Sequence, residues 1–264
     1  SIGLLQNSSF DEIAVLINDS LKLGADNNEV YDWKKDFEER FKPQFRNPIP
    51  TGWTLIDSIC KGGLGQKELG VVIAPTGAGK SMALVHLGAQ ALLRGKTVIH
   101  YTLELQDTVV GSRYDSCITK IPLASLHSFK ERIYEDIQSI EGRLIIKEYP
   151  TKSASTHTLK THLERLRMKD IDIDLIIVDY ADLLRPVIAQ REKRNELESI
   201  YEELRGLAQE YKCPIWTASQ TNRSGLNAEV ITMESISEAF NKCFVSDFIF
   251  TLSRTVEDKL GNTG

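Results

Sequence analysis

The chain has 264 residues, of which 41% are hydrophobic, and a formal net charge of −5. These values predict a globular protein with one sizeable core and argue against a protein that coats nucleic acid along its whole surface. No apolar run approaches the roughly 18–20 residues of a membrane span, and the chain does not begin with a signal-peptide pattern, so we expect a cytoplasmic protein without a membrane segment. The four cysteines are widely spaced and include no C-x-x-C pair, so the sequence indicates neither a zinc site nor a disulfide framework.

The first part of the chain predicts an amphipathic helical arm. Apolar residues recur at helical spacing over residues 9–42. Its last aromatic members are Trp33, Phe37 and Phe41. Prolines between residues 43 and 50 then predict an extended linker. We therefore expect an arm over residues 1–46 and a main domain over residues 47–264. The arm must bury its apolar stripe either on its own domain or on a neighbouring subunit, and the sequence leaves both open.

From residue 70 onward, strand and helix patterns alternate. Short apolar runs predict strands over residues 71–73, 97–103, 144–146, 175–178, 215–219 and 248–252. Helical periodicity predicts helices over residues 80–94, 107–120, 156–168 and 192–211. This alternation is typical of an α/β fold with a mainly parallel sheet that is covered on both faces, in which ligands bind at the carboxyl ends of strands.

A phosphate-binding loop is predicted where the first of these strands meets the first helix. Its residues are Ala74, Pro75, Thr76, Gly77, Ala78, Gly79, Lys80, Ser81 and Met82. In such a loop, backbone N–H groups turn toward an anion, Lys80 lies against the β- and γ-phosphates, and the Ser81 hydroxyl binds a Mg²⁺ ion. Ala74 stands where the usual pattern has its first glycine, and a small residue can fill that position without blocking the turn. The segment predicts a nucleoside-triphosphate site.

Polar residues that follow three other strands complete the predicted site. Asp179 ends an apolar strand and is the candidate Mg²⁺ ligand, with Asp182 as a less favoured alternative. Glu104 is the candidate base that activates water, and Gln220 is a candidate sensor of the γ-phosphate. Each of these residues has a simpler reading as a turn-forming or solvated polar residue at the end of a strand.

These motifs, in this order, resemble the RecA-like motor domain of DnaB-type replicative helicases, including those of bacteriophages. The segments that carry the resemblance are Thr51–Asp57, Gly62–Leu64, Ala74–Ser81, Thr102–Leu105, Asp179–Tyr180 with Leu183–Leu184, and Ser219–Arg223. The resemblance implies a RecA-like P-loop NTPase that hydrolyses ATP with Mg²⁺. It also implies that Glu104 activates water, that Asp179 serves the metal, and that Gln220 couples the nucleotide state to DNA. Arg113 matches a common arginine position of the family, for which we assign no role.

The family acts as a ring, usually hexameric, that encircles single-stranded DNA, moves 5′ to 3′ and unwinds duplex DNA. The resemblance therefore implies a homo-oligomer in a bacterial or phage-infected cytoplasm, with a primase or helicase loader as a further partner, and an arm that docks on the adjacent subunit. Two loops, over residues 185–195 and 222–233, would face the channel. Their candidate DNA-binding residues are Arg185, Arg191, Lys193, Arg194 and Arg223. The alternative for the first loop is that its charges simply lie in solvent at the start of a helix and bind no DNA.

The chain also departs from the family pattern. No separate N-terminal domain is visible beyond the arm, and the chain stops at Gly264 before the basic segment that in the family reaches the neighbour's ATP site. We therefore expect a main domain that is truncated at its C-terminus. Arg254 is a poor substitute for the arginine finger that this segment supplies in the family. Two other functions stay open, a RecA- or RadA-type recombinase and a KaiC-like, nucleotide-gated oligomeric regulator. The regulator would assemble with ATP but would show no stimulation of its ATPase by DNA.

Overall fold

A computed structural model of the chain describes residues 32–41, 46–221 and 244–253. Its contacts divide the chain into two units, residues 1–47 and residues 48–264. The sheet, both apolar clusters of the core and the predicted nucleotide loop lie within the second unit. Arg223, Arg254, the loop over residues 222–233 and most of the predicted arm lie outside the described residues.

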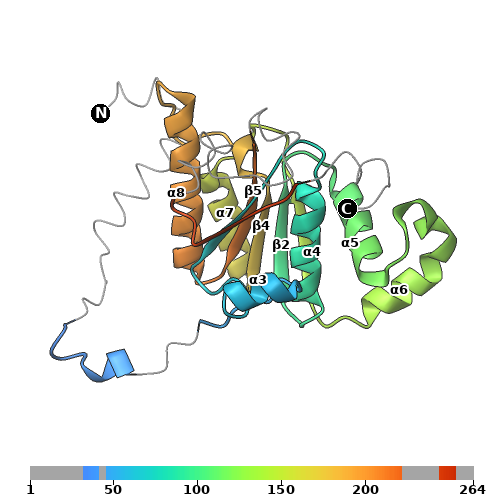
Figure 1. The fold of residues 1–264 in the computed structure, drawn as a ribbon, viewed down its shortest axis with the longest axis horizontal. Coiled ribbons are helices and arrows are strands. Elements are labelled where there is room, and N and C mark those ends of the chain that lie inside the picture. The colour runs from blue at the N-terminus through green and yellow to red at the C-terminus, as the bar shows by residue number, and fades with distance from the viewer. Residues whose placement is uncertain (1–31, 42–45, 222–243, 254–264) are drawn as a thin grey trace. The chain divides into compact units, whose positions relative to one another are not determined.

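The second unit is built around a six-stranded sheet whose described pairings are all parallel (Figure 1). Its strands are β1 (Leu69–Ala74), β2 (Thr97–Thr102), β3 (Arg143–Glu148), β4 (Leu175–Asp179), β5 (Ile215–Gln220) and β6 (Phe248–Thr251). They lie in the order β3-β2-β4-β5-β1-β6. Every residue of β1 and β4 is buried, which explains why these strands read as continuous apolar runs rather than as alternating ones. The predicted α/β fold with a parallel sheet is confirmed.

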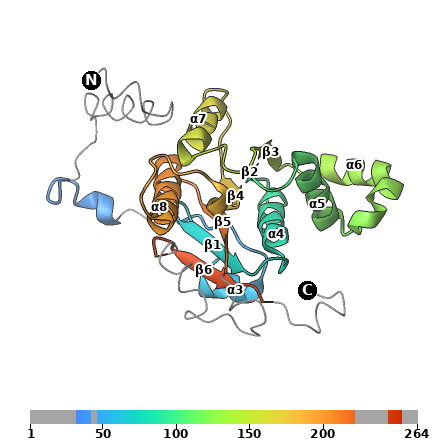
Figure 2. The same ribbon diagram turned by 90° about the horizontal axis from the view of Figure 1, so that it is seen from above.

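Helices cover both faces of this sheet. They are α3 (Thr54–Ile59), α4 (Lys80–Leu92), α5 (Asp107–Thr119), α6 (Lys130–Gln138), α7 (Thr156–Arg167) and α8 (Lys193–Tyr211), with 3-10 turns η2 (Leu123–Phe129) and η3 (Ala181–Leu183). Figure 2 shows α7 and α8 on one side of the sheet and α4 and α5 on the other. Leu163 of α7 and Leu204 of α8 belong to one buried cluster, and Leu84 of α4 and Val110 of α5 to a second cluster. The sheet therefore separates two apolar layers.

A glycine fixes the contact between β1 and β5. Gly70 is the register partner of Trp216, whose side chain is buried. A Cβ atom at position 70 would lie 2.3 Å from Cζ3 of Trp216, so only glycine lets the indole occupy this position. The close contact holds together the two strands that carry the phosphate loop and Gln220.

The observed elements agree with the predicted ones to within a few residues at their ends, but α3 and α6 were not predicted. Helix α6 has nine residues, which is shorter than the window of about 11–18 residues over which helical periodicity is read. Helix α3 has six residues, none of them buried, and no side-chain cap at its start. Short helices without a buried stripe give the sequence little periodicity to detect.

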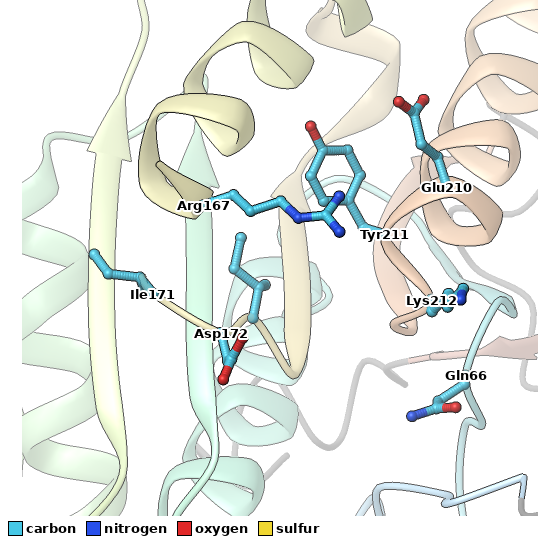
Figure 3. A pocket seen from close by; sticks show the side chains of 8 residues that line it. Gln66, Arg167, Ile171, Asp172, Glu210, Tyr211 and Lys212 are labelled. Atoms are coloured by element: carbon cyan, nitrogen blue, oxygen red, sulfur yellow. The ribbon is translucent and has the colours of Figure 1, made fainter. Parts of the chain in front are cut away.

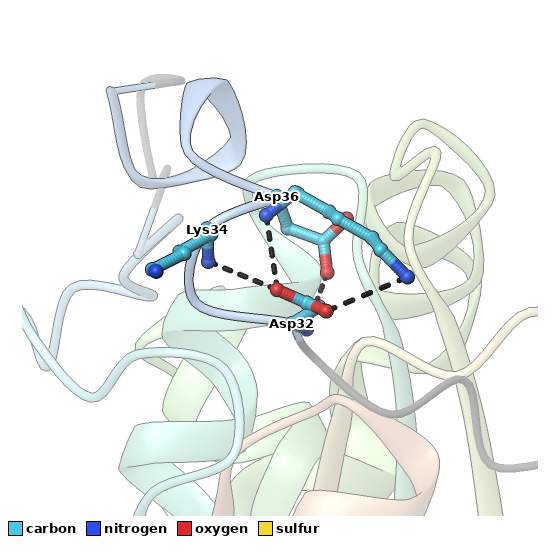
Figure 4. Close-up of polar contacts among 4 residues, drawn as sticks. Asp32, Lys34 and Asp36 are labelled. Atoms are coloured by element: carbon cyan, nitrogen blue, oxygen red, sulfur yellow. Dashed lines mark hydrogen bonds and ion pairs between the residues drawn. The ribbon is translucent and has the colours of Figure 1, made fainter.

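The first unit is described over residues 32–41 and 46–47. Asp32 Oδ1 accepts hydrogen bonds from the backbone N–H groups of Lys34 and Lys35 at 3.0 Å each, and Asp36 Oδ2 accepts one from the Asp32 N–H at 2.6 Å (Figure 4). These backbone hydrogen bonds lower the pKa of Asp32. A 3-10 helix, η1 (Glu38–Phe41), follows this turn. The described part of the predicted arm is thus a turn capped by Asp32 and a 3-10 helix rather than an α-helix.

Candidate functional site

The predicted site residues meet at one edge of the sheet. Strands β2, β4, β5 and β1 are consecutive neighbours in the sheet. Glu104 follows β2, Asp179 ends β4, Gln220 ends β5, and the phosphate loop follows β1. Because all four strands are parallel, their carboxyl ends lie together. The structure therefore brings side chains separated by as much as 146 positions in the sequence, from Ala74 to Gln220, to a single edge.

The loop between β1 and α4 has the backbone of a phosphate cradle. Gly77 and Gly79 have φ values of 77° and 103°, in the left-handed region that favours glycine. A Cβ atom at either position would meet no atom within 4 Å, so the loop borders open space. Lys80 begins α4, whose first turn contains no acidic residue, and the free N–H groups of this turn carry the positive end of the helix dipole. These features fit an anion such as a triphosphate.

Lys80 is held inside this loop. It is 9% exposed, and its Nζ donates hydrogen bonds to the carbonyl oxygens of Ala74 at 3.4 Å and Pro75 at 3.2 Å. Burial lowers the pKa of Lys80, and the negative charges of Glu104, Asp179 and Asp182 oppose that shift. The ammonium group thus lies close to the carboxylates at the strand ends. It is the kind of compact cation that binds phosphate oxygens.

Asp179 is a buried carboxylate without a partner. It is 0% exposed, and neither of its oxygens has a hydrogen-bond partner of normal geometry among the described residues. Burial raises the pKa of Asp179 to about 6; the nearby Ser81 hydroxyl opposes this shift, the Glu104 charge adds to it, and the Arg113 and Lys80 charges oppose it. A buried, unpaired carboxylate is costly in free energy, and a bound cation would remove that cost. Asp179 and Ser81 therefore fit a Mg²⁺ ion.

Asp182 has a different environment. Its Oδ1 accepts a hydrogen bond from the Tyr201 hydroxyl at 2.9 Å. Its Oδ2 accepts hydrogen bonds from the Ser219 hydroxyl and from the Gln220 backbone N–H, both at 3.3 Å. Because protein donors use both of its oxygens, Asp182 fits a metal less well than Asp179 does.

Glu104 lies on a fixed turn and is exposed to solvent. The Thr102 hydroxyl donates to the Leu105 carbonyl at 2.8 Å and accepts from the Leu105 N–H at 3.2 Å, which closes the turn around Glu104. The Leu103 N–H donates to the Asp179 carbonyl at 2.9 Å, which ties this turn to β4. An accessible carboxylate on a fixed backbone, close to Lys80 and Asp179, can orient a water molecule and accept its proton.

Gln220 contacts the phosphate loop. Its Nε2 donates a hydrogen bond to the Thr76 hydroxyl at 2.6 Å, and its Oε1 lies 3.5 Å from the Tyr180 hydroxyl. The Lys80 ammonium in turn lies 5.6 Å from the centre of the Tyr180 ring. Sequence reasoning used Tyr180 only as part of a motif, and this contact, which depends on the register of β4 and β5, could not be derived from spacing. Because Gln220 is hydrogen-bonded to Thr76, a change in the conformation of the loop would alter the position of the Gln220 side chain.

Arg113 is a second residue to which the sequence assigned no role. It lies on α5, and its positive charge opposes the rise that burial causes in the pKa of Asp179. The next residue, Tyr114, is buried, and its hydroxyl lies 2.9 Å from His100 Nδ1 in β2. Helix α5 thereby brings a cation to the same edge of the sheet.

The basic segment over residues 185–195 spans two elements. Arg185 is half-buried, and its backbone N–H donates to the Ala154 carbonyl at 2.9 Å. Arg191 and Arg194 are exposed, and Lys193 is the first residue of α8. Three of the four basic residues of this segment, Arg191, Lys193 and Arg194, thus lie at or just before the start of α8. Binding of nucleic acid by these residues stays a prediction.

A hollow of about 300 Å³ lies at the opposite edge of the sheet (Figure 3). It is lined by Gln66, Arg167, Ile171, Asp172, Ile173, Glu210, Tyr211 and Lys212. These residues adjoin the amino ends of β1 and β4 and the C-terminal ends of α7 and α8. None of the predicted site residues lines this hollow, and Figure 3 shows acidic and basic side chains around it, so it offers no single chemical character for a ligand.

Among the described residues, no group of three or more His, Cys, Asp or Glu side chains could hold a metal without further ligands. In the part of the chain that the structure describes, no helix is both long and apolar enough to cross a membrane.

Comparison with protein families matches residues 48–229 to the DnaB-like helicase C terminal domain. The chain belongs to this family. The match covers the sheet edge with its phosphate loop, Glu104, Asp179 and Gln220, and the family resemblance read from the sequence is confirmed. Membership of this DnaB-like family implies that the chain uses a nucleotide.

This DnaB-like chain spans only part of the length of two relatives. It is 27% identical over 256 residues to a DnaB-like replicative helicase of Enterobacteria phage T4, with 92% of this chain and 54% of that protein covered. It is 25% identical over 181 residues to a replicative DNA helicase DnaB of Helicobacter pylori strain J99, with 67% of this chain and 37% of that protein covered. The chain thus spans about half of the phage relative and less of the bacterial one.

Solved structures agree with the fold. One structure of an ATPase domain has a TM-score of 0.69 at 16% identity, with 98% of this chain and 87% of that chain covered. A structure that describes a DnaB-like replicative helicase and its interactions with primase has a TM-score of 0.70 at 14% identity, with 94% of this chain and 62% of that chain covered. Both comparisons support the RecA-like fold expected from the sequence.

Proposed function

We propose that this DnaB-like chain is the ATP-driven motor of a replicative DNA helicase, which moves 5′ to 3′ on single-stranded DNA and unwinds duplex DNA. The observation that carries the proposal is the buried, unpartnered Asp179 carboxylate beside a lysine-containing phosphate loop, at an edge that also presents Glu104 and Gln220. This set includes a phosphate cradle, a metal ligand, a base and a sensor, which together are what nucleotide hydrolysis requires. Family membership supports the coupling of that hydrolysis to DNA.

In this proposal the loop over residues 74–82 binds the triphosphate of ATP. Its N–H groups and the start of α4 bind phosphate oxygens, and Lys80 exchanges the carbonyls of Ala74 and Pro75 for the β- and γ-phosphates. Ser81 and Asp179 hold Mg²⁺, which when bound supplies positive charge to neutralise the phosphates.

Glu104 orients the attacking water and accepts its proton. Its exposure and fixed backbone support this role, because a base must reach solvent while keeping its direction. Lys80 stabilises negative charge that develops on the transferred phosphoryl group. Gln220 senses the loop through Thr76, because the hydrogen bond between their side chains must adjust when a phosphate enters.

The DNA contacts in this proposal come from Arg185, Arg191, Lys193, Arg194 and Arg223. Positive charge gathered on short segments can follow a phosphate backbone without reading base sequence, and it is compatible with a net charge of −5. We further propose a hexameric ring with the arm on the adjacent subunit, a primase or helicase loader as partner, and a bacterial or phage-infected cytoplasm as location.

The test is steady-state ATP hydrolysis by the full chain with Mg²⁺, with and without single-stranded oligo(dT). We expect oligo(dT) to raise the turnover number, and Lys80→Ala to reduce turnover by about 100-fold or more through loss of phosphate contacts. Asp172→Asn is the matched control, because Asp172 is exposed and lies at the opposite edge of the sheet. A Lys80→Ala variant with normal turnover would refute the phosphate-loop assignment, and turnover that oligo(dT) leaves unchanged would argue for a nucleotide-gated regulator.

A further inference from the structure

The last residues of β5 extend beyond β4. Strand β5 pairs with β4 as far as Val178 and Thr217, but it pairs with β1 as far as Ala74 and Gln220. On the side that faces β4, the final backbone groups of β5 therefore have no strand partner. Backbone groups in such a position need a substitute hydrogen bond, because an unpaired one is costly.

Asp182 and Tyr201 provide that substitute. The Gln220 N–H donates to Asp182 Oδ2 at 3.3 Å. The Tyr201 hydroxyl lies 2.9 Å from Asp182 Oδ1 and 3.2 Å from the Ala218 carbonyl oxygen, so its single proton is shared between two acceptors. Tyr201 is completely buried on α8. Two side chains from other elements thus complete the end of β5.

These bonds form a continuous path from the phosphate loop to α8. Thr76 accepts the hydrogen bond of the Gln220 side chain, the Gln220 backbone binds one oxygen of Asp182, and the other oxygen binds Tyr201. Helix α8 begins within the basic segment over residues 185–195. Asp182 is therefore the junction between the nucleotide loop and the helix that begins with two of the proposed DNA contacts, Lys193 and Arg194.

The backbone at Asp182 is held in place independently of its carboxylate. Lys152 Nζ donates to the carbonyl oxygens of Asp182 at 2.9 Å and Leu184 at 2.6 Å. The Ala181 N–H donates to the Thr217 hydroxyl at 3.0 Å. A substitution that changes only the Asp182 carboxylate should therefore leave this turn in place.

We infer that Asp182 is a positioning residue that holds Gln220 against the phosphate loop and links this contact to α8, rather than a metal ligand. The inference rests on the proposed function, because it assigns Asp182 to the coupling step of that same site. The two carboxylate oxygens are both required, since one faces a donor on α8 and the other faces donors on β5. An asparagine has one acceptor oxygen, which can serve only the donors on β5 or the Tyr201 hydroxyl. Its NH₂ group could donate to the Tyr201 hydroxyl only if that hydroxyl gave its proton wholly to the Ala218 carbonyl, and the bonds on both sides would lose the charge of the carboxylate.

The experiment compares Asp182→Asn, Tyr201→Phe and the double variant with the wild-type chain, with Asp172→Asn as the charge-matched control. For each full-length protein, calorimetry gives the Kd of Mg²⁺-ATPγS, and steady-state assays with saturating oligo(dT) give kcat and KM for ATP. We expect Asp182→Asn to keep Kd and KM within about threefold of wild type and to lower kcat by about tenfold or more. Tyr201→Phe should lower kcat by about threefold, and the double variant should be no slower than Asp182→Asn, because both changes break the same link.

Other results would overturn the inference. A kcat of Asp182→Asn within about twofold of an active wild type would refute the positioning role and leave the proposed function standing. A Kd weakened by about tenfold or more with Mg²⁺ but not with EDTA would make Asp182 a metal ligand. A wild-type chain without any ATP turnover would refute the proposed function and this inference with it. If Asp182→Asn does not unfold cooperatively, the test rests on Tyr201→Phe alone. An unchanged kcat of that variant would then refute the proposed link between Asp182 and α8.

Discussion

Replacement of Asp179 by asparagine should change how the stability of the nucleotide-free chain depends on pH. Asp179 is completely buried, and burial raises its pKa from 3.8 to about 6. Since the folded chain binds this proton more tightly than the unfolded chain, the carboxylate costs nothing while it is protonated and destabilises the fold as pH rises. Stability is therefore lost between about pH 4 and pH 6, and the loss is complete above that range. The difference between the two pKa values corresponds to about 3 kcal/mol, of which about half falls between pH 5 and pH 8.

The assay is urea unfolding of the wild type and Asp179→Asn in EDTA at several values of pH. The free-energy difference between the two proteins should change by about 1–2 kcal/mol from pH 5 to pH 8, in favour of the asparagine variant at higher pH. Any cost of burying the amide of the new asparagine is independent of pH. The test is therefore how the difference in unfolding free energy changes with pH, and not its value at any one pH. A difference that stays constant across this range would show that Asp179 is not a destabilised carboxylate in the folded chain.

Three further predictions concern other parts of the molecule. Glu104→Gln should bind Mg²⁺-ATPγS as the wild type does but hydrolyse ATP about 10²- to 10⁴-fold more slowly, and normal turnover would assign water activation to another residue. Gly70→Ala should lower the free energy of unfolding by about 1–3 kcal/mol, because the new Cβ would lie 2.3 Å from the Trp216 ring; an unchanged urea midpoint would mean that the ring moves away without cost. Deletion of residues 1–46 should weaken self-association in sedimentation velocity if the arm docks on a neighbouring subunit, and unchanged sedimentation would count against that docking.

Much of the fold could be predicted because its central strands are buried on both faces. Short, wholly apolar runs such as β1 and β4 are typical of strands in the interior of a parallel sheet, and their alternation with periodic helices leaves little choice of architecture. The same reasoning brought Glu104, Asp179 and Gln220 together, because parallel strands in one sheet end at one edge. These predictions needed only the order of elements along the chain.

What could not be predicted depends on register and on side-chain direction. The role of Asp182 could not be separated from that of Asp179 by spacing, since both follow the same strand. The difference arises because β4 ends before β5 does, and because Tyr201 on a later helix points at Asp182. Helix α6 was missed because its nine residues are fewer than the window of about 11–18 residues over which helical periodicity is read. The sequence contains these residues but not the distances between them.

The order of strands in the sheet also has a consequence for how the protein folds during synthesis. Strand β1, which leads into the phosphate loop, is the first of the described strands along the chain, yet its neighbours β5 and β6 are the last two of them. The ribosome must therefore complete about 145 further residues before β1 meets its first partner, as the positions of Ala74 and Gln220 require. Until then a wholly apolar strand is unpaired on both edges, which invites chaperone binding or aggregation. A nascent chain should acquire nucleotide affinity abruptly and late, after β5 has joined the sheet.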